Sequence, residues 1–290
     1  MDALLHQIFG GLATGCIYSG VALSIVMIYQ STNHINFAQG EMAMFSTFIA
    51  WALLQYGLPY WVAFGLTVAV SFLGGVAIER IILRPFANAP ILAIVIVFIG
   101  LLVAFNSLAG WIFGYTLQSF PSPFPSRPLF GNRYLSGHET GLMLVFLLVV
   151  VLLYGFFRFT PLGLAMRATA ANPVSSRLVG IRVGWMLALG WGLAAAIGAV
   201  AGMMVAPVLY LEPNMMSGTL IYAFAAALLG GLDNPWGAAL GGILVGISEN
   251  VLGAYVVGTE LKLTVALVII IGVLLVRPSG LFGRTIVTRV

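Results

Sequence analysis

Long apolar runs alternate with short polar stretches along almost the whole chain. Because a helix rises about 1.5 Å per residue, about 20 apolar residues are needed to cross a hydrocarbon core about 30 Å thick. Runs of this kind indicate an all-α, polytopic transmembrane helical bundle that forms a single domain over residues 1–290. We predict about eight or nine spans, placed at Leu4–Tyr29, Ile35–Gln55, Trp61–Leu83, Ile91–Gly114, Gly141–Phe157, Val183–Val208, Thr219–Leu232, Trp236–Tyr255 and Leu263–Val276.

Glycines four residues apart are frequent in these predicted spans. Lipid supplies no hydrophobic drive between helices, so small residues at this spacing favour close contact between helix backbones. We therefore expect close helix packing at Gly11 and Gly15, Gly198 and Gly202, Gly237 and Gly241, and Gly242 and Gly246.

The composition agrees with a membrane protein, since 61% of the residues are hydrophobic and only 7% are charged. A soluble domain of this length needs far more charge to cover its surface. The only cysteine is Cys16, which excludes an internal disulfide. The histidines His6, His34 and His138 have no acidic or cysteine partner at metal-ligand spacing, so we expect no metal site.

Two predicted spans, Thr219–Leu232 and Leu263–Val276, are too short to cross a bilayer as straight helices. The stretch Gly230–Ala238 interrupts the apolar pattern with Asp, Asn and Pro, and Asn33–Glu41 has a similar place in the first half. Interrupted segments at comparable places in two halves indicate broken helices that line a transport path. The pattern is also compatible with an inverted repeat.

The basic residues indicate the orientation of the chain. If residues 158–182 are cytoplasmic, alternation puts nine of the twelve basic residues inside and leaves Arg127, Arg133 and Lys262 outside. The positive-inside rule then places the N-terminus outside and the C-terminus in the cytoplasm. The proline-rich loop 115–139 is expected to be a stiff excursion on the outer side.

The segment from Arg158 to Arg182 holds four arginines and no acidic residue. Its first part, Leu162–Ala171, is rich in residues that favour helices. Asn172 is suited to cap a second helix whose first residue is Pro173, where the missing N–H does no harm.

Gly180 is suited to end that second helix. Two short helices on the cytoplasmic face would present Arg167 and Arg177 to water or to a partner protein. The alternative is a basic surface loop held by anionic lipid. The length and the caps favour a docking surface, because a loop that only sets orientation can be much shorter.

Polar residues inside the predicted spans are candidates for the translocation path. Intramembrane acids are costly and usually face a bundle interior, which selects Glu41 and Glu249. The alternative for Glu41 is an acid at a helix start that reaches the interface. Asn36, Gln39 and Asn106 are weaker candidates, because an amide can also simply bond a neighbouring helix.

Several enzyme signatures are absent from the sequence. A phosphate-binding P-loop needs Gly-Lys-Ser/Thr, and the only lysine, Lys262, stands in GTELKL. No GxSxG or HExxH motif is present either, which argues against a membrane hydrolase or protease. We expect a chain that is not itself an enzyme.

Several of these stretches resemble those of a known protein family. The chain resembles permease subunits of the branched-chain amino acid type of ABC importers, in particular the H-type subunit of the pair. That family often has a His where this chain has Gln39. The stretches that carry the resemblance are Ile35–Glu41, Thr160–Val183, Phe224–Asn250 and Arg277–Gly283.

The resemblance implies a multi-pass subunit of the bacterial inner membrane with the ABC importer permease fold. It implies four kinds of partner: a second, similar permease, two cytoplasmic P-loop ATPases that bind ATP and Mg, an extracytoplasmic solute-binding protein and membrane lipid. The permease itself would hold no cofactor, and no nucleic acid is expected to bind. The solutes would be branched-chain or other small amino acids, although the family also includes importers of urea and short amides.

Carried onto this sequence, the resemblance assigns two sets of residues. Glu41 and Glu249 would lie near the path. A function of a different class, a self-sufficient channel or ion-coupled transporter, would use the same two acids as ion sites. The surface coupled to the ATPase would include Arg167, Asn172, Pro173, Arg177 and Gly180.

Overall fold

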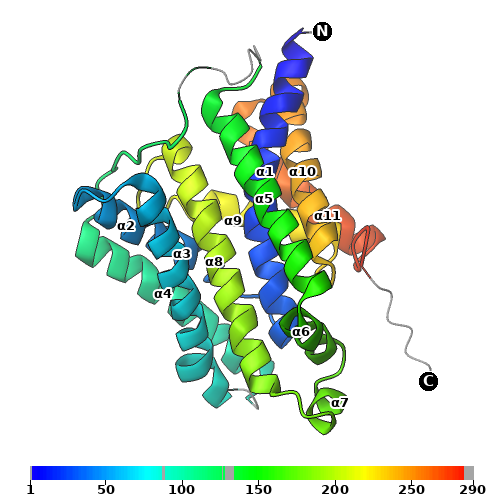
Figure 1. Cartoon of the computed structure of the whole chain (residues 1–290). Helices are drawn as coiled ribbons and strands as arrows, with labels where there is room; N and C mark the ends of the chain where they lie inside the picture. The colour runs from blue at the N-terminus through cyan, green and yellow to red at the C-terminus, as the bar shows by residue number, and fades with distance from the viewer. Residues whose placement is uncertain (1, 87–88, 126, 128–133, 284–290) are drawn as a thin grey trace. The chain divides into compact units, whose positions relative to one another are not determined.

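The computed structural model describes residues 2–86, 89–125, 127 and 134–283 (Figure 1). Regular structure in these residues is helical, apart from one isolated antiparallel bridge between Gln118 and Leu211. The α-helices are α1 (Asp2–Thr32), α2 (Gln39–Gln55), α3 (Tyr60–Ala77), α4 (Ile91–Phe113), α5 (Gly137–Phe159), α6 (Pro161–Ala171), α7 (Pro173–Leu178), α8 (Val183–Leu209), α9 (Met216–Gly230), α10 (Pro235–Leu252) and α11 (Lys262–Val276).

Each predicted span overlaps one of these helices, which confirms the all-α prediction. Within the described residues, α2, α9 and α11 are shorter than a full span, with 17, 15 and 15 residues. In the part of the chain that the structure describes, seven helical segments are long and apolar enough to cross a membrane: Asp2–Thr32, Tyr60–Phe86, Ile91–Phe113, Gly137–Phe159, Val183–Leu209, Pro235–Val257 and Thr259–Val276.

Several predicted boundaries were wrong for local reasons. The second helix begins at Gln39 and not at Ile35. Asn33 adopts a left-handed conformation with φ 55° and ends α1, and Ala38 N then donates to Asn36 Oδ1 in the turn before α2. The outer loop ends before 139, because Ser136 and Glu139 bond each other's backbone N–H and start α5 early.

The last span was also predicted too short. A 3-10 turn, η5 (Thr259–Leu261), precedes α11, and together they form the continuous segment Thr259–Val276. A π-helical stretch, η4 (Gly253–Val257), extends α10 in the same way. Arg133, Arg284 and Arg289, which entered the orientation count, lie outside the described residues.

The chain divides into two compact units that each take several stretches of sequence. The first unit takes residues 1–26, 124–143 and 217–290, and the second takes residues 27–123 and 144–216. The prediction of a single domain stays a prediction, and each unit is described by itself.

In the first unit, α1 and α10 touch backbone to backbone. A Cβ added to Gly11 would lie 2.7 Å from Ile247 Cα, and one added to Gly15 would lie 2.7 Å from Ile243 Cα. Ser19 Oγ donates a hydrogen bond of 2.5 Å to the carbonyl oxygen of Ala239. The predicted small-residue packing is therefore confirmed for this helix pair.

The turn between α9 and α10 is closed by the stretch Arg277–Gly283. The backbone N–H of Leu281 donates to Leu229 O at 2.7 Å, and Asn234 Nδ2 donates to Phe282 O at 3.0 Å. Gly231 and Gly280 meet there with φ 107° and 77°, conformations that glycine adopts without strain. The interruption predicted between these helices is thus a tight, bonded turn.

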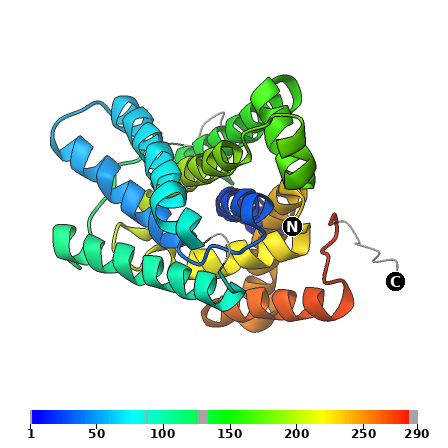
Figure 2. The same cartoon turned by 90° about the horizontal axis from the view of Figure 1, so that it is seen from below.

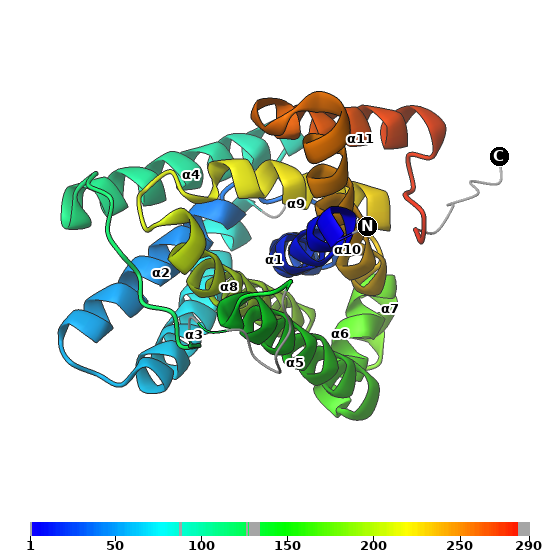
Figure 3. The same cartoon turned by 90° about the horizontal axis from the view of Figure 1, so that it is seen from above.

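In the second unit, α2 packs against α3, α4 and α8 (Figure 3). Gly202 lets α8 approach closely, since a Cβ there would lie 2.7 Å from Ala43 O of α2. The indole of Trp191 is fully buried and stacks on Phe98 with ring centroids 6.0 Å apart. The first contact packs α2 on α8, and the ring pair packs α4 on α8.

Candidate functional site

The basic segment after Arg158 folds as the two short helices that its capping residues predict. Arg158 itself lies in the last turn of α5. Asn172 Oδ1 accepts a hydrogen bond of 2.9 Å from Ser175 N, and Pro173 is the first residue of α7. Gly180 follows α7 with φ 85°, which confirms the predicted stop.

The first of these helices has a cap that we did not predict. Thr160 Oγ1 accepts a hydrogen bond of 3.0 Å from Gly163 N, and Pro161 stands at the first position. The sequence signal was present in Thr-Pro followed by helix formers. Gly163 lies against the backbone of α5, and the buried side chain of Met166 faces Gly190 of α8.

The exposed surface of this segment is both basic and apolar. Figure 2 shows the backbone of its two short helices in green. Arg167 and Arg177 are exposed, as predicted. The tip around α7 adds three exposed apolar side chains that the sequence analysis did not single out. These are Val174, Leu178 and Val179, with exposed fractions of 66%, 85% and 76%.

Asn36 and Gln39 are fully buried and bond one another. Asn36 Nδ2 donates to Gln39 Oε1 at 3.3 Å, and Gln39 Nε2 donates to Ala194 O of α8 at 3.1 Å. Asn36 Oδ1 also accepts from Ala38 N at 3.0 Å. The pair therefore fastens the start of α2 to α8, which is the alternative considered for such amides.

Glu41 and Asn106 meet in the same unit. Asn106 Nδ2 lies 3.4 Å from Glu41 Oε2, 2.9 Å from Pro213 O and 3.1 Å from Asn214 Oδ1. An amide nitrogen carries only two hydrogens, so its longest contact, to Glu41, is the weakest of the three. No ion pair of the described residues involves Glu41.

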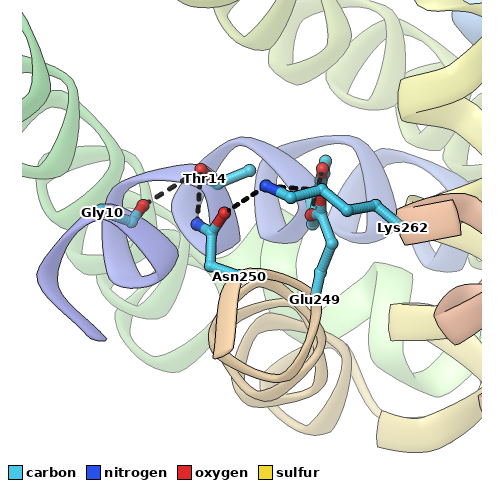
Figure 4. A network of polar contacts seen from close by, with 6 residues as sticks. Gly10, Thr14, Glu249, Asn250 and Lys262 are labelled. Carbon is cyan, nitrogen blue, oxygen red and sulfur yellow. Dashed lines mark hydrogen bonds and ion pairs between the residues drawn. The ribbon is translucent and has the colours of Figure 1, made fainter. Parts of the chain in front are cut away.

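Glu249 lies in the first unit among many partners (Figure 4). The hydroxyl of Tyr18 donates to Glu249 Oε2 at 2.6 Å, and Lys262 Nζ lies 3.9 Å from Oε1. Tyr222 also bonds this carboxyl and stacks on Tyr18 with ring centroids 4.7 Å apart. The carboxyl therefore joins α1, α9, α10 and α11.

A second branch of this network leaves Lys262 toward α1. Lys262 Nζ donates to Asn250 Oδ1 at 2.7 Å, and Asn250 Nδ2 donates to Thr14 Oγ1 at 3.4 Å. Thr14 in turn donates to Gly10 O at 3.0 Å, as Figure 4 shows. From its position in the sequence Lys262 is expected to be an outer charge, and its pairing with Glu249 was not predicted.

A chain of apolar helices with few buried charges and a capped surface segment belongs to the class of multi-pass membrane proteins. The chain belongs to the family of permease components of branched-chain amino acid transport systems, whose family model matches residues 7–274. This confirms the resemblance and the expected role as the permease component of an ABC importer.

Two curated relatives match nearly the full length. The chain is 30% identical to "High-affinity branched-chain amino acid transport system permease protein LivH" of Escherichia coli over 309 residues, which cover 99% of this chain and 97% of the relative. It is 32% identical to the corresponding protein BraD of Pseudomonas aeruginosa over 302 residues, which cover 99% and 98%.

A solved structure also resembles this fold. It is titled "PsaBC from Streptococcus pneumoniae in complex with Fab" and matches with a TM-score of 0.49 at 14% identity, covering 93% of this chain and 91% of that chain. A likeness of this strength is too weak for a comparison of individual helices.

Proposed function

We propose that this chain passes branched-chain or other small amino acids across the bacterial inner membrane, with energy supplied by other chains. The family membership and the names of the relatives LivH and BraD support the solute class. The observation that carries the proposal is the pair of capped helices α6 and α7 on a chain that has no P-loop.

The proposed assembly contains a second, similar permease, two cytoplasmic P-loop ATPases and an extracytoplasmic binding protein. ATP and Mg bind to the ATPases, so this chain needs no cofactor and performs no hydrolysis itself. The sequence supports this division of labour, because its only lysine, Lys262, does not stand in the Gly-Lys-Ser/Thr motif of a P-loop. The N-terminus lies outside and the C-terminus in the cytoplasm, as the distribution of arginines favours.

The proposed docking surface is α7 with its two flanking turns, together with the exposed Arg167 of α6. Its exposed apolar side chains Val174, Leu178 and Val179 supply the area that excludes water on docking. The arginines Arg167 and Arg177 supply charge that orients the partner. Asn172, Pro173 and Gly180 hold the shape of this surface by starting and ending α7.

The proposed path includes Glu41 and Asn106. A carboxyl without a cation partner can attract the ammonium group of an amino acid, and the amides of Asn106 and Asn214 can bond its carboxylate. Asn36 and Gln39 contribute by holding the start of α2 in place. Glu249 stays a candidate for the path, although its partners support a structural role.

Reconstituted uptake tests this function. The chain, purified with the ATPases and the second permease that copurify with it, is placed in liposomes with ATP inside and binding protein outside. We expect leucine uptake that needs ATP, and we expect Arg177→Glu with Leu178→Glu to lower both ATPase association and uptake about tenfold or more. Uptake by the purified chain alone, unaffected by these changes, would show a self-sufficient transporter.

A further inference from the structure

The end of α3 departs from regular α-helix. After Ala77 the chain continues as a π-helix, η1 (Ile78–Leu83), and then as a 3-10 turn, η2 (Arg84–Phe86). π-Helical turns are rare and occur mostly at functional sites. The turn contains two charged residues of a membrane-spanning segment, Glu79 and Arg80.

Arg80 reaches across to the first turn of α8. Its guanidinium carbon lies 3.9 Å from the centroid of the Trp185 ring, in the geometry of a cation–π interaction. Trp185 follows Arg182, the last residue of the coupling segment Arg158–Arg182, by only three positions. The contact therefore joins α3 to the point where that segment enters the bundle.

The bonding of Arg80 is incomplete. Its Nε lies 3.8 Å from Glu79 Oε2, which is an ion pair but too long for a hydrogen bond. In the described part of the chain, Nε and Nη2 of Arg80 and Oε2 of Glu79 are buried without a hydrogen-bond partner. Arg80 is thus held by a ring face and a neighbouring charge, which impose little directional constraint.

Farther along, the same two helices are joined rigidly. A Cβ added to Gly75 would lie 2.5 Å from Trp191 O, and one added to Gly192 would lie 2.8 Å from a methyl group of Val76. Such contacts leave no room for sliding. The α3–α8 pair therefore has a fixed part around Gly75 and an adaptable part around Arg80.

We propose that the Arg80–Trp185 contact transmits movement of the coupling segment to α3, and that the π-helical turn absorbs the change in shape. This inference rests on the proposed function. When the ATPases move α6 and α7, Trp185 moves with the first turn of α8, and Arg80 follows the ring. The unbonded donors of Arg80 are available to stabilise the second arrangement. Arg80 and Trp185 are positioning residues in this account.

Two matched pairs of variants test the contact in the reconstituted importer. Trp185→Phe keeps an aromatic face and Trp185→Leu removes it, while Arg80→Lys keeps the cation and Arg80→Met removes it. The measurement is the amount of leucine moved per ATP hydrolysed, together with the unfolding temperature of the assembled importer. Arg84→Met is the control, because Arg84 is exposed and lies beside Gly184 of the same turn of α8, whereas the cation over the Trp185 ring is Arg80.

We expect Trp185→Leu and Arg80→Met to lower the leucine-to-ATP ratio about threefold, within the range of changes that modulate coupling between sites. Trp185→Phe, Arg80→Lys and Arg84→Met should keep most of the ratio, and the unfolding temperature should not change. An unchanged ratio in the Leu and Met variants would overturn the inference.

A fall shared equally by the Phe and Lys variants, with a lower unfolding temperature, would show a structural role only and would also overturn the inference. Failure of the proposed function looks different, since the wild-type importer would then hydrolyse ATP and move no leucine. Failure of this inference leaves wild-type uptake intact.

Discussion

Glu41 and Glu249 are acids inside predicted spans, each only 6% exposed, and they differ in the groups around them. Glu249 has a cation at 3.9 Å and a tyrosine hydroxyl at 2.6 Å, so its charge is compensated where it lies. Glu41 has one amide at 3.4 Å, and that amide has two closer acceptors. Equal burial thus accompanies two different surroundings: the partners of Glu249 tie helices together, whereas Glu41, under the proposed function, keeps bonding capacity for a solute.

The largest expected effect comes from removing the cation that compensates the charge of Glu249. Lys262→Met leaves the buried Glu249 carboxyl without its cation and should destabilise the chain by on the order of 3 kcal/mol. Unfolding in detergent micelles measures this. The double variant Lys262→Met with Glu249→Gln should recover part of the loss, because no uncompensated charge remains. If Lys262→Met alone left the stability unchanged, that result would contradict the structural role of Glu249.

A backbone change in the same region should have a somewhat smaller effect. Gly15→Ala puts a Cβ 2.7 Å from Ile243 Cα and forces α1 away from α10, near the residues that surround Glu249. We expect a loss of about 2 kcal/mol in the same unfolding measurement, as for other overpacked sites. Gly10→Ala is the matched control, because nothing lies within 4 Å of its added Cβ. Equal stability of the two variants would show that α1 and α10 are not in contact.

The smallest expected effect concerns the donor beside Glu41. Asn106→Ala removes the amide that bonds Glu41, Pro213 and Asn214, and should lower leucine uptake about threefold, the worth of one modest hydrogen bond. Asn250→Ala, the amide beside Glu249, should instead lower stability and leave uptake per folded molecule unchanged. If Asn106→Ala lowered only stability and Asn250→Ala lowered only uptake, Glu249 and not Glu41 would lie in the path.

The spans and the caps could be predicted because their causes are local. A membrane requires apolar runs of a given length, and Asn172 with Pro173 starts a helix whatever surrounds it. Boundary errors also had local causes, such as the left-handed Asn33 before α2. The signal of Ser136 and Glu139 at the start of α5 was present in the sequence and was missed.

The partners of the candidate site residues could not be predicted, because they come from distant parts of the chain. Tyr18 and Glu249 are 231 positions apart, and Gln39 and Ala194 are 155 apart. Apolar patterning shows that a residue lies in a span, but it does not show which helix faces it. For that reason the sequence made Glu41 and Glu249 equal candidates for the path, whereas the groups around them differ in the structure.

The most direct test compares Glu41→Gln with Glu249→Gln in the reconstituted importer, with uptake and unfolding measured on the same preparations. Both changes keep the shape of the side chain and remove its charge. The account predicts that Glu41→Gln lowers leucine uptake about tenfold, the kinetic equivalent of about 1.4 kcal/mol, at unchanged stability. Glu249→Gln should lower stability and leave uptake per folded molecule unchanged. Normal uptake by the Glu41 variant, with loss of uptake by a stable Glu249 variant, would contradict it.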